Sequence, residues 1–187
     1  VENVLAYARL EHGRPTARNE NLSVCELIDR CRPRLVQRTD ETRLSLSVAL
    51  EPDAASARLT TNALAVEQIL FNLVDNSCKY AGDAADPRLV CQVDVAGSQL
   101  VIRVSDFGPG LSPAARSKLF QPFRKSASQA AETAPGIGLG LSLSRRLAEE
   151  LRGSLCCLPK TGTGLTFEFR LPLDTDRTLG VPCSQNS

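Results

Sequence analysis

Residues 66–81, VEQILFNLVDNSCKYA, have the apolar periodicity of a helix with one broad buried side. At about 100° per residue, one arc collects Val66, Ile69, Leu70, Leu73, Val74 and Cys78. Asn62 stands where an N-cap is needed, so the sequence predicts a helix over 62–81. A helix with an apolar side of this width has to pack against another layer of secondary structure.

The remaining periodic segments supply that layer. Helices are predicted at 23–40, opened by the capping-box spacing of Ser23 and Glu26, and at 139–152, with a short helical stretch near 113–120. Strands are predicted at 43–50, 56–61, 88–95, 99–106, 154–159 and 164–171. This order predicts an α+β fold: a two-layer α/β sandwich whose helices cover one face of a mixed, mostly antiparallel sheet.

The charges nearly cancel, because 22 Lys and Arg face 21 Asp and Glu. The net charge gives no case for a nucleic-acid partner. No apolar run approaches the ~18 residues of a membrane span, so we expect no membrane segment in this chain and a cytoplasmic location. The seven cysteines form no CxxC pair and His12 is the only histidine, which makes a zinc site or a disulfide framework improbable and favours reduced thiols.

Three polar residues of the predicted helix 62–81 share one stripe: Asn72, Asn76 and Lys79, at i, i+4 and i+7. An Asn oxygen can ligate a divalent cation, and a Lys one turn further can reach a phosphate. A solvated helix face would have the same pattern, so the stripe alone does not decide between the two.

Glycines lead into the predicted helix 139–152 in the stretch GIGLGL, residues 136–141. Glycines before a helix N-terminus let backbone N–H groups approach an anion closely, which is how a phosphate is cradled. A glycine-rich hinge is the alternative. The stretch fits neither GxxxxGK[ST] nor GxGxxG.

The stretch VSDFGPG, residues 104–110, contains the Asp-Phe-Gly of protein kinases. That assignment fails because the single histidine, His12, cannot form the upstream HRD loop. Asp106 instead ends a strand and enters a glycine turn, where its carboxylate could accept a hydrogen bond from an exocyclic amine such as that of adenine. A turn-capping aspartate is the simpler alternative.

Taken together and in this order, the motifs resemble the ATP-binding catalytic domain of sensor histidine kinases, in the GHKL superfamily that also includes type II topoisomerases, MutL and heat-shock chaperones. The matching segments are NLVDNSCKY (72–80), SDFGPGL (105–111), LFQPF (119–123) and GIGLGLSLSRRLAEELRGSL (136–155). The resemblance implies a Bergerat-type fold. It divides the chain into the end of a dimerisation helix with a linker (1–20), the ATP-binding domain (21–173) and a disordered tail (174–187).

The resemblance also implies a role for each motif residue. Asn76 would ligate Mg²⁺ with support from Asn72, Lys79 would lie near phosphate, and Tyr80 would flank the adenine or ribose. Asp106 would accept the adenine amine. The base pocket would be shaped by Gly108 and Gly110, and the phosphates would meet the N–H groups of Gly136, Gly138, Gly140 and Leu141.

Residues 111–135 would form an ATP lid anchored by Phe120 and Phe123, with Arg124 or Lys125 meeting the γ-phosphate. The implied catalytic residues are thus Asn76, Lys79 and Lys125.

The implied activity is transfer of the γ-phosphoryl group of ATP to a histidine on a dimerisation domain. The acceptor segment is absent from this sequence, so we expect the chain to bind ATP and Mg²⁺ without autophosphorylating by itself. The expected partners are a second kinase chain, through dimerisation helices, and a response-regulator receiver domain. Two alternatives are a serine kinase of the anti-sigma-factor type and a non-catalytic nucleotide-sensing module.

Overall fold

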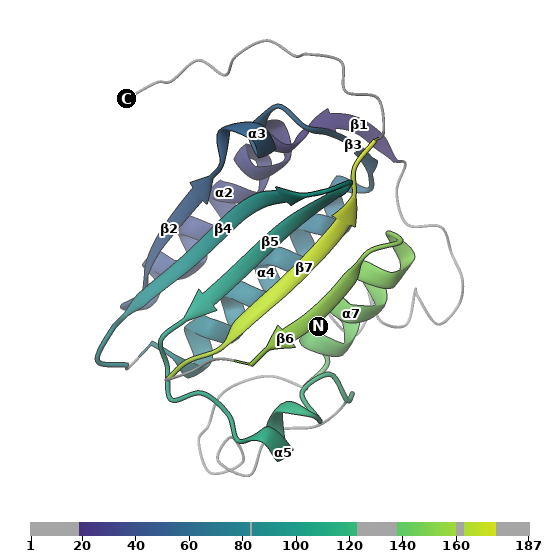
Figure 1. The fold of residues 1–187 in the computed structure, drawn as a ribbon. Helices are drawn as coiled ribbons and strands as arrows, with labels where there is room; N and C mark the ends of the chain where they lie inside the picture. Colours follow the sequence, from purple (N-terminus) through teal and green to yellow (C-terminus); the bar gives the residue numbers. More distant parts are fainter. Residues whose placement is uncertain (1–18, 83, 123–137, 160–162, 175–187) are drawn as a thin grey trace.

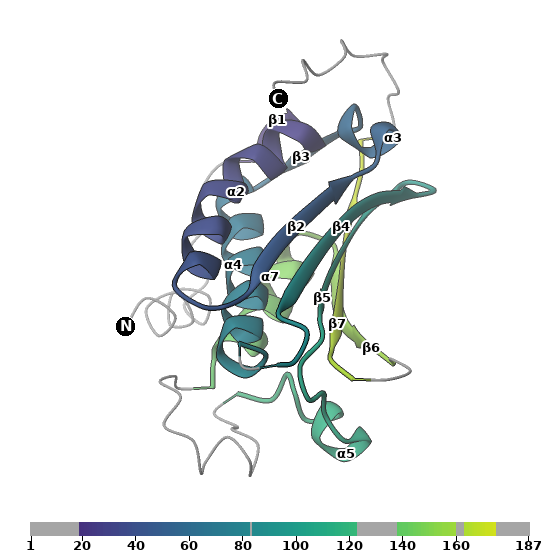
Figure 2. The same cartoon turned by 90° about the vertical axis from the view of Figure 1, so that its left-hand side faces the viewer.

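The fold is described from a computed structural model, over residues 19–82, 84–122, 138–159 and 163–174. Two layers are visible in Figure 1 and, edge-on, in Figure 2: a twisted sheet, and a layer of helices that covers one of its faces. The same views place the small helix α5 (Pro113–Arg116) beyond one end of the sheet.

The main sheet has five strands among the described residues, in the order β2-β4-β5-β7-β6. The strands are β2 (Ser45–Leu50), β4 (Arg88–Ala96), β5 (Gln99–Asp106), β6 (Ser154–Leu158) and β7 (Thr166–Pro172). Only the β2–β4 pair is parallel, and the other three pairs are antiparallel. The predicted α+β sandwich with a mixed, mostly antiparallel sheet is therefore confirmed.

Three helices form the second layer: α2 (Val24–Asp40), α4 (Ala63–Tyr80) and α7 (Gly140–Glu150). The predicted capping box opens α2, since Ser23 Oγ accepts from the Glu26 N–H and the Glu26 carboxylate accepts from the Ser23 N–H. The predicted N-cap of α4 is also present, with Asn62 Oδ1 accepting from the Ala65 N–H at 3.2 Å. Local capping signals thus fix where two of these helices begin.

The core lies between the layers, where the apolar side of α4 meets the inward-facing side chains of β4, β5 and β7. Fully buried side chains from both layers include Leu27, Ile69, Leu70, Leu73, Leu89, Ile102, Phe167 and Phe169. All six residues of the apolar arc predicted for α4 are buried.

Two short elements were not predicted. Strand β1 (Glu20–Ser23) pairs with β3 (Arg58–Thr61) in a separate two-stranded sheet, and α3 (Pro52–Ala55) is a single turn. Asp174, just after β7, accepts from the backbone N–H and the hydroxyl of Thr60, so it joins the end of the main sheet to this small one.

Most of the segment predicted as the end of a dimerisation helix with a linker (1–20) lies outside the described residues, as does most of the predicted tail (174–187). Among the described helices, none combines the length and the apolar character that crossing a membrane requires.

Candidate functional site

The polar stripe of α4 faces the start of α7 at its first member, Asn72. This side chain is only 5% exposed, and its Nδ2 donates to the Gly140 carbonyl at 3.2 Å and to Ser144 Oγ at 3.0 Å. Gln68 donates to Asn72 Oδ1 at 3.1 Å. The Nδ2 group of Asn72 therefore ties the first turn of α7 to α4. The bond from Gln68 to its Oδ1 fixes the orientation of the amide.

The other two members of the stripe are more accessible. Asn76 is half-buried, and among the described residues its side chain makes no hydrogen bond. An amide oxygen in this position suits Mg²⁺, which takes one or two protein ligands and completes its shell with phosphate oxygens and water. Lys79 donates to the Asp75 carboxylate at 2.5 Å, one turn earlier on the same helix.

Asp106, at the end of β5, is buried and held by three donors. Its Oδ1 accepts from the backbone N–H groups of Gly108 and Leu165, each at 3.1 Å, and its Oδ2 accepts from Ser77 Oγ at 3.2 Å. The donors come from the loop after β5, the turn before β7 and the last turn of α4. The carboxylate is thus fixed where the two layers of the sandwich meet.

Glycines let the backbone close around Asp106. A Cβ on Gly108 would lie 2.8 Å from the Cβ of Ala81, at the end of α4, and Gly110 has a φ of +73°. Gly164, with a φ of +92°, lies so close that a Cβ would come within 2.1 Å of the Asp106 carbonyl oxygen. The sequence singled out Gly108 and Gly110, and the structure places Gly108 against Asp106 and Gly110 against the backbone of Gly164.

The N-terminus of α7 has no side-chain cap in the part of the chain that the structure describes. Gly138, with a φ of +73°, turns the chain into the helix, followed by buried Leu139 and half-buried Gly140 and Leu141. A helix N-terminus without a cap leaves backbone N–H groups available to an anion. Gly136, the first glycine of the predicted cradle, lies outside the described residues.

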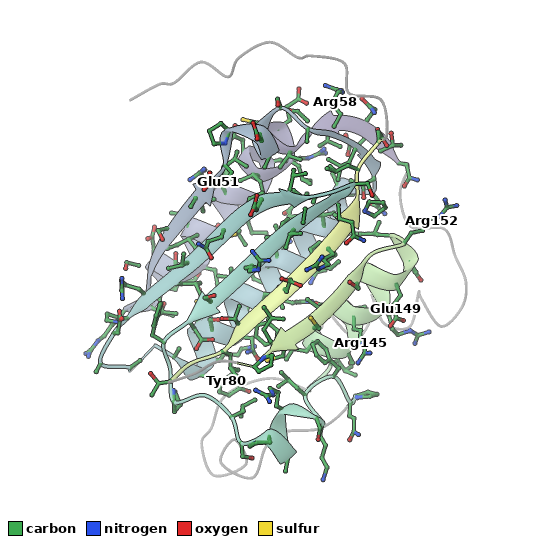
Figure 3. All side chains as sticks on the ribbon, in the orientation of Figure 1. Glu51, Arg58, Tyr80, Arg145, Glu149 and Arg152 are labelled. Carbon is green, nitrogen blue, oxygen red and sulfur yellow. The ribbon has the colours of Figure 1, made fainter. Side chains whose placement is uncertain are left out.

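Phe120 stands at the base of the predicted lid and reaches the core. Its ring packs edge-on against Phe167 with centroids 6.4 Å apart, and the Arg145 guanidinium of α7 lies over the Phe120 ring, 5.3 Å from its centroid. Figure 3 shows Arg145 and Glu149 along α7, beside β6. Phe123, Arg124 and Lys125, the other lid residues named from the sequence, lie outside the described residues.

A cleft of about 330 Å³ adjoins the Asp106 loop, between α5 and the turn before β7. It is lined by Pro109, Gly110, Leu111, Ser112, Arg116, Leu158, Gly164 and Leu165. Tyr80, at the end of α4, lies toward the same end of the molecule in Figure 3. Burial, and then the nearby Asp75 carboxylate, raise the pKa of Tyr80.

Two residues of this site were not found from the sequence: Ser77, which donates to Asp106, and Gly164. Ser77 is almost fully buried and, at about 100° per residue, lies inside the apolar arc of α4, where a small hydroxyl gives no signal of a site. Gly164 falls in a turn where glycine is ordinary. Their importance comes from contacts with Asp106, which is 29 and 58 positions away in the sequence.

Comparison with known proteins gives the family. A model of the family described as histidine kinase-, DNA gyrase B-, and HSP90-like ATPase matches residues 61–175, more than half of the chain. The chain belongs to this family. The resemblance to the ATP-binding domain of sensor histidine kinases is confirmed, and membership of a family of ATPases supports ATP as the nucleotide.

Individual relatives are sensor proteins. The chain is 29% identical over 175 residues to the sensor protein KdpD of Escherichia coli K12, which covers 94% of this chain and 19% of KdpD. It is 30% identical over 173 residues to the C4-dicarboxylate transport sensor protein DctB of Rhizobium meliloti, covering 91% of this chain and 25% of DctB. The chain thus spans about a fifth to a quarter of these relatives.

Solved structures share the fold. Full-length ShkA, in complex with AMPPNP, superposes with a TM-score of 0.77 at 22% identity, over 94% of this chain and 35% of ShkA. The catalytic domain of the histidine kinase ThkA superposes with a TM-score of 0.67 at 22% identity, over 83% of this chain and 96% of that domain.

Proposed function

We propose that this domain binds ATP and Mg²⁺ and supplies the γ-phosphoryl group that a sensor histidine kinase transfers to a histidine on its dimerisation domain. The observation that carries the proposal is the Asp106 carboxylate, fixed by three donors beside α4. A rigid acceptor in a buried position selects for a donor on the ligand, and the exocyclic amine of adenine is such a donor.

The phosphates are assigned to the other side of the site. The uncapped start of α7 offers backbone N–H groups and the positive end of the helix dipole to them. Lys79 adds a cation and Asn76 an amide oxygen. Asn72 keeps the two helices in register by its bonds to Gly140 and Ser144.

Asn76 is the residue assigned to hold Mg²⁺. When bound, the ion neutralises phosphate charge and so lowers the barrier to phosphoryl transfer. The chain itself would contribute positioning: Asp106 would hold the base and the start of α7 the phosphates, so that the terminal phosphate is held in one place for an incoming histidine.

In the intact protein the acceptor histidine belongs to a dimerisation domain. The inferred macromolecular partners are therefore a second kinase chain and, for the phosphohistidine, a receiver domain of a response regulator. The names of the relatives, which are sensor proteins and sensor kinases, support this assignment.

The test uses the intact protein that carries this chain, incubated with γ-labelled ATP and Mg²⁺. We expect label on the protein that is lost in acid and retained in alkali, as for a phosphohistidine. Asn76→Ala should reduce the labelling rate by about a hundred-fold or more, and should weaken nucleotide binding much less.

Acid-stable label would instead indicate a serine kinase. ATP binding without any label would indicate a nucleotide-sensing module. Labelling at the native rate by Asn76→Ala would remove this residue from the metal site.

A further inference from the structure

The Asp75 carboxylate, on α4, lies between two cations. Its Oδ2 accepts from Lys79 Nζ at 2.5 Å, and its Oδ1 accepts from Nε of Arg38 on α2 at 2.8 Å. The three side chains are 18%, 26% and 20% exposed, in the order Asp75, Lys79, Arg38. These pairs are partly shielded from solvent, so removing one partner leaves a partly buried charge unpaired and destabilises the folded protein.

Arg38 is held in place independently of Lys79. Its Nη1 donates to Glu41 Oε2 at 3.0 Å, while its Nε serves Asp75. Burial alone lowers the pKa of Arg38, but the hydrogen bond and charge of Asp75, with smaller contributions that include Glu41, outweigh it and raise the pKa. The guanidinium is therefore a permanent cation, bonded to the carboxylate oxygen of Asp75 that Lys79 does not use.

Lys79 has two competing acceptors in this arrangement. A nucleotide phosphate would compete with Asp75 for the position and charge of the Lys79 ammonium, so the 2.5 Å bond to Oδ2 would weaken as Lys79 moves toward the phosphate. A partly buried carboxylate that loses its cation is destabilised. Arg38 bonds to the other oxygen, so its bond survives the departure of Lys79.

We propose that Arg38 is a positioning residue for nucleotide binding. By keeping Asp75 neutralised, it lets Lys79 exchange between this carboxylate and the phosphates of the nucleotide. The inference rests on the proposed function, since it takes the phosphate group as the second acceptor of Lys79.

The test measures binding of ATP, ADP and adenosine by calorimetry. In Arg38→Gln, the Kd for ATP should rise about five-fold, and the Kd for adenosine, which has no phosphate, should not change. Adding Asp75→Asn to Arg38→Gln should restore the native Kd for ATP or lower it, because no carboxylate then competes for Lys79. Arg38→Lys, which keeps the charge, should lie close to the native value.

Arg34→Gln is the matched control. Arg34 lies one turn before Arg38 and also joins α2 to α4, with its Nη1 3.3 Å from Glu67 Oε1. The same change at this position should leave the Kd for ATP unaltered.

Three results would overturn the proposal alone: an unchanged ATP Kd in Arg38→Gln, an equal loss of adenosine binding, or failure of Asp75→Asn to restore affinity. Failure of the native chain to bind ATP would overturn the proposed function and this inference with it.

Discussion

Gly164 decides how closely the turn before β7 can approach Asp106. Any Cβ at this position would lie 2.1 Å from the Asp106 carbonyl oxygen, and the φ of +92° is unfavourable for every other residue. Gly164→Ala should therefore lower the free energy of unfolding by about 3 kcal/mol or more. Urea unfolding followed by circular dichroism measures this difference.

Gly97 supplies the control for that substitution. It has a similar positive φ of +63°, but a Cβ there would meet nothing within 4 Å. Gly97→Ala should cost only about 1–2 kcal/mol, from the backbone conformation alone. Equal losses at the two positions would show that the contact with Asp106 is unimportant.

Asp106 could be found from the sequence because it stands at a strand end beside two glycines. Two of its donors could not. Ser77 and the Leu165 N–H are brought to it by the packing of α4 against the sheet and by the pairing of β5 with β7, and neither follows from residues near Asp106. Sequence patterns thus indicate Asp106 as a candidate but leave out what fixes the orientation of its carboxylate.

At the scale of elements, Asn72 couples α4 to α7. Asn72→Ala removes the two bonds to Gly140 and Ser144, and also the bond that Asn72 accepts from Gln68. The loss should be about 1–3 kcal/mol of unfolding free energy, together with a weaker affinity for ATP because the start of α7 is no longer held. Thermal unfolding and calorimetry on the same variant measure the two effects.

Gln68→Ala separates the two effects of Asn72→Ala. It removes one bond to Asn72 but keeps both bonds from Asn72 to α7. Its ATP affinity should stay near the native value. A similar affinity loss in both variants would contradict the coupling role of Asn72.

Elements with strong local signals were predicted well. The capping box of α2 and the Asn62 cap of α4 each act within a few residues, and both are observed. Strand β1 and the parallel pairing of β2 with β4 were not predicted, because both depend on partners about 40 residues away.

At the scale of the whole molecule, buried thiols make stability depend on alkaline pH. Burial raises the pKa of Cys31 and Cys91 to about 12, from an ordinary value of 9.0. Below pH 9 both thiols are neutral in the folded and unfolded states. Between pH 9 and 12 only the unfolded chain ionises them, so the free energy of unfolding should fall over that range.

Urea unfolding at pH 8 and pH 10.5, with a reductant present, measures this fall. Lysines and tyrosines also titrate in this range, so Cys31→Ala/Cys91→Val is the comparison: its stability should fall less than that of the native chain. The same fall in both proteins would show that the thiols do not contribute.

The central claim is that the Asp106 carboxylate recognises the adenine amine. Asp106→Asn suits its test, because the Asn oxygen can still accept from the Gly108 and Leu165 N–H groups while its NH₂ faces Ser77 Oγ, which can accept. The fold should therefore persist while the edge offered to the base changes from acceptor to donor.

The most direct measurement is the calorimetric Kd of ATP and of inosine triphosphate, which carries a carbonyl oxygen where adenine has its amine, for the native chain and for Asp106→Asn. We predict that the native chain prefers ATP by about ten-fold or more, and that Asp106→Asn abolishes the preference. Equal affinities of the native chain for the two nucleotides, or the same ATP preference in Asp106→Asn, would contradict the account.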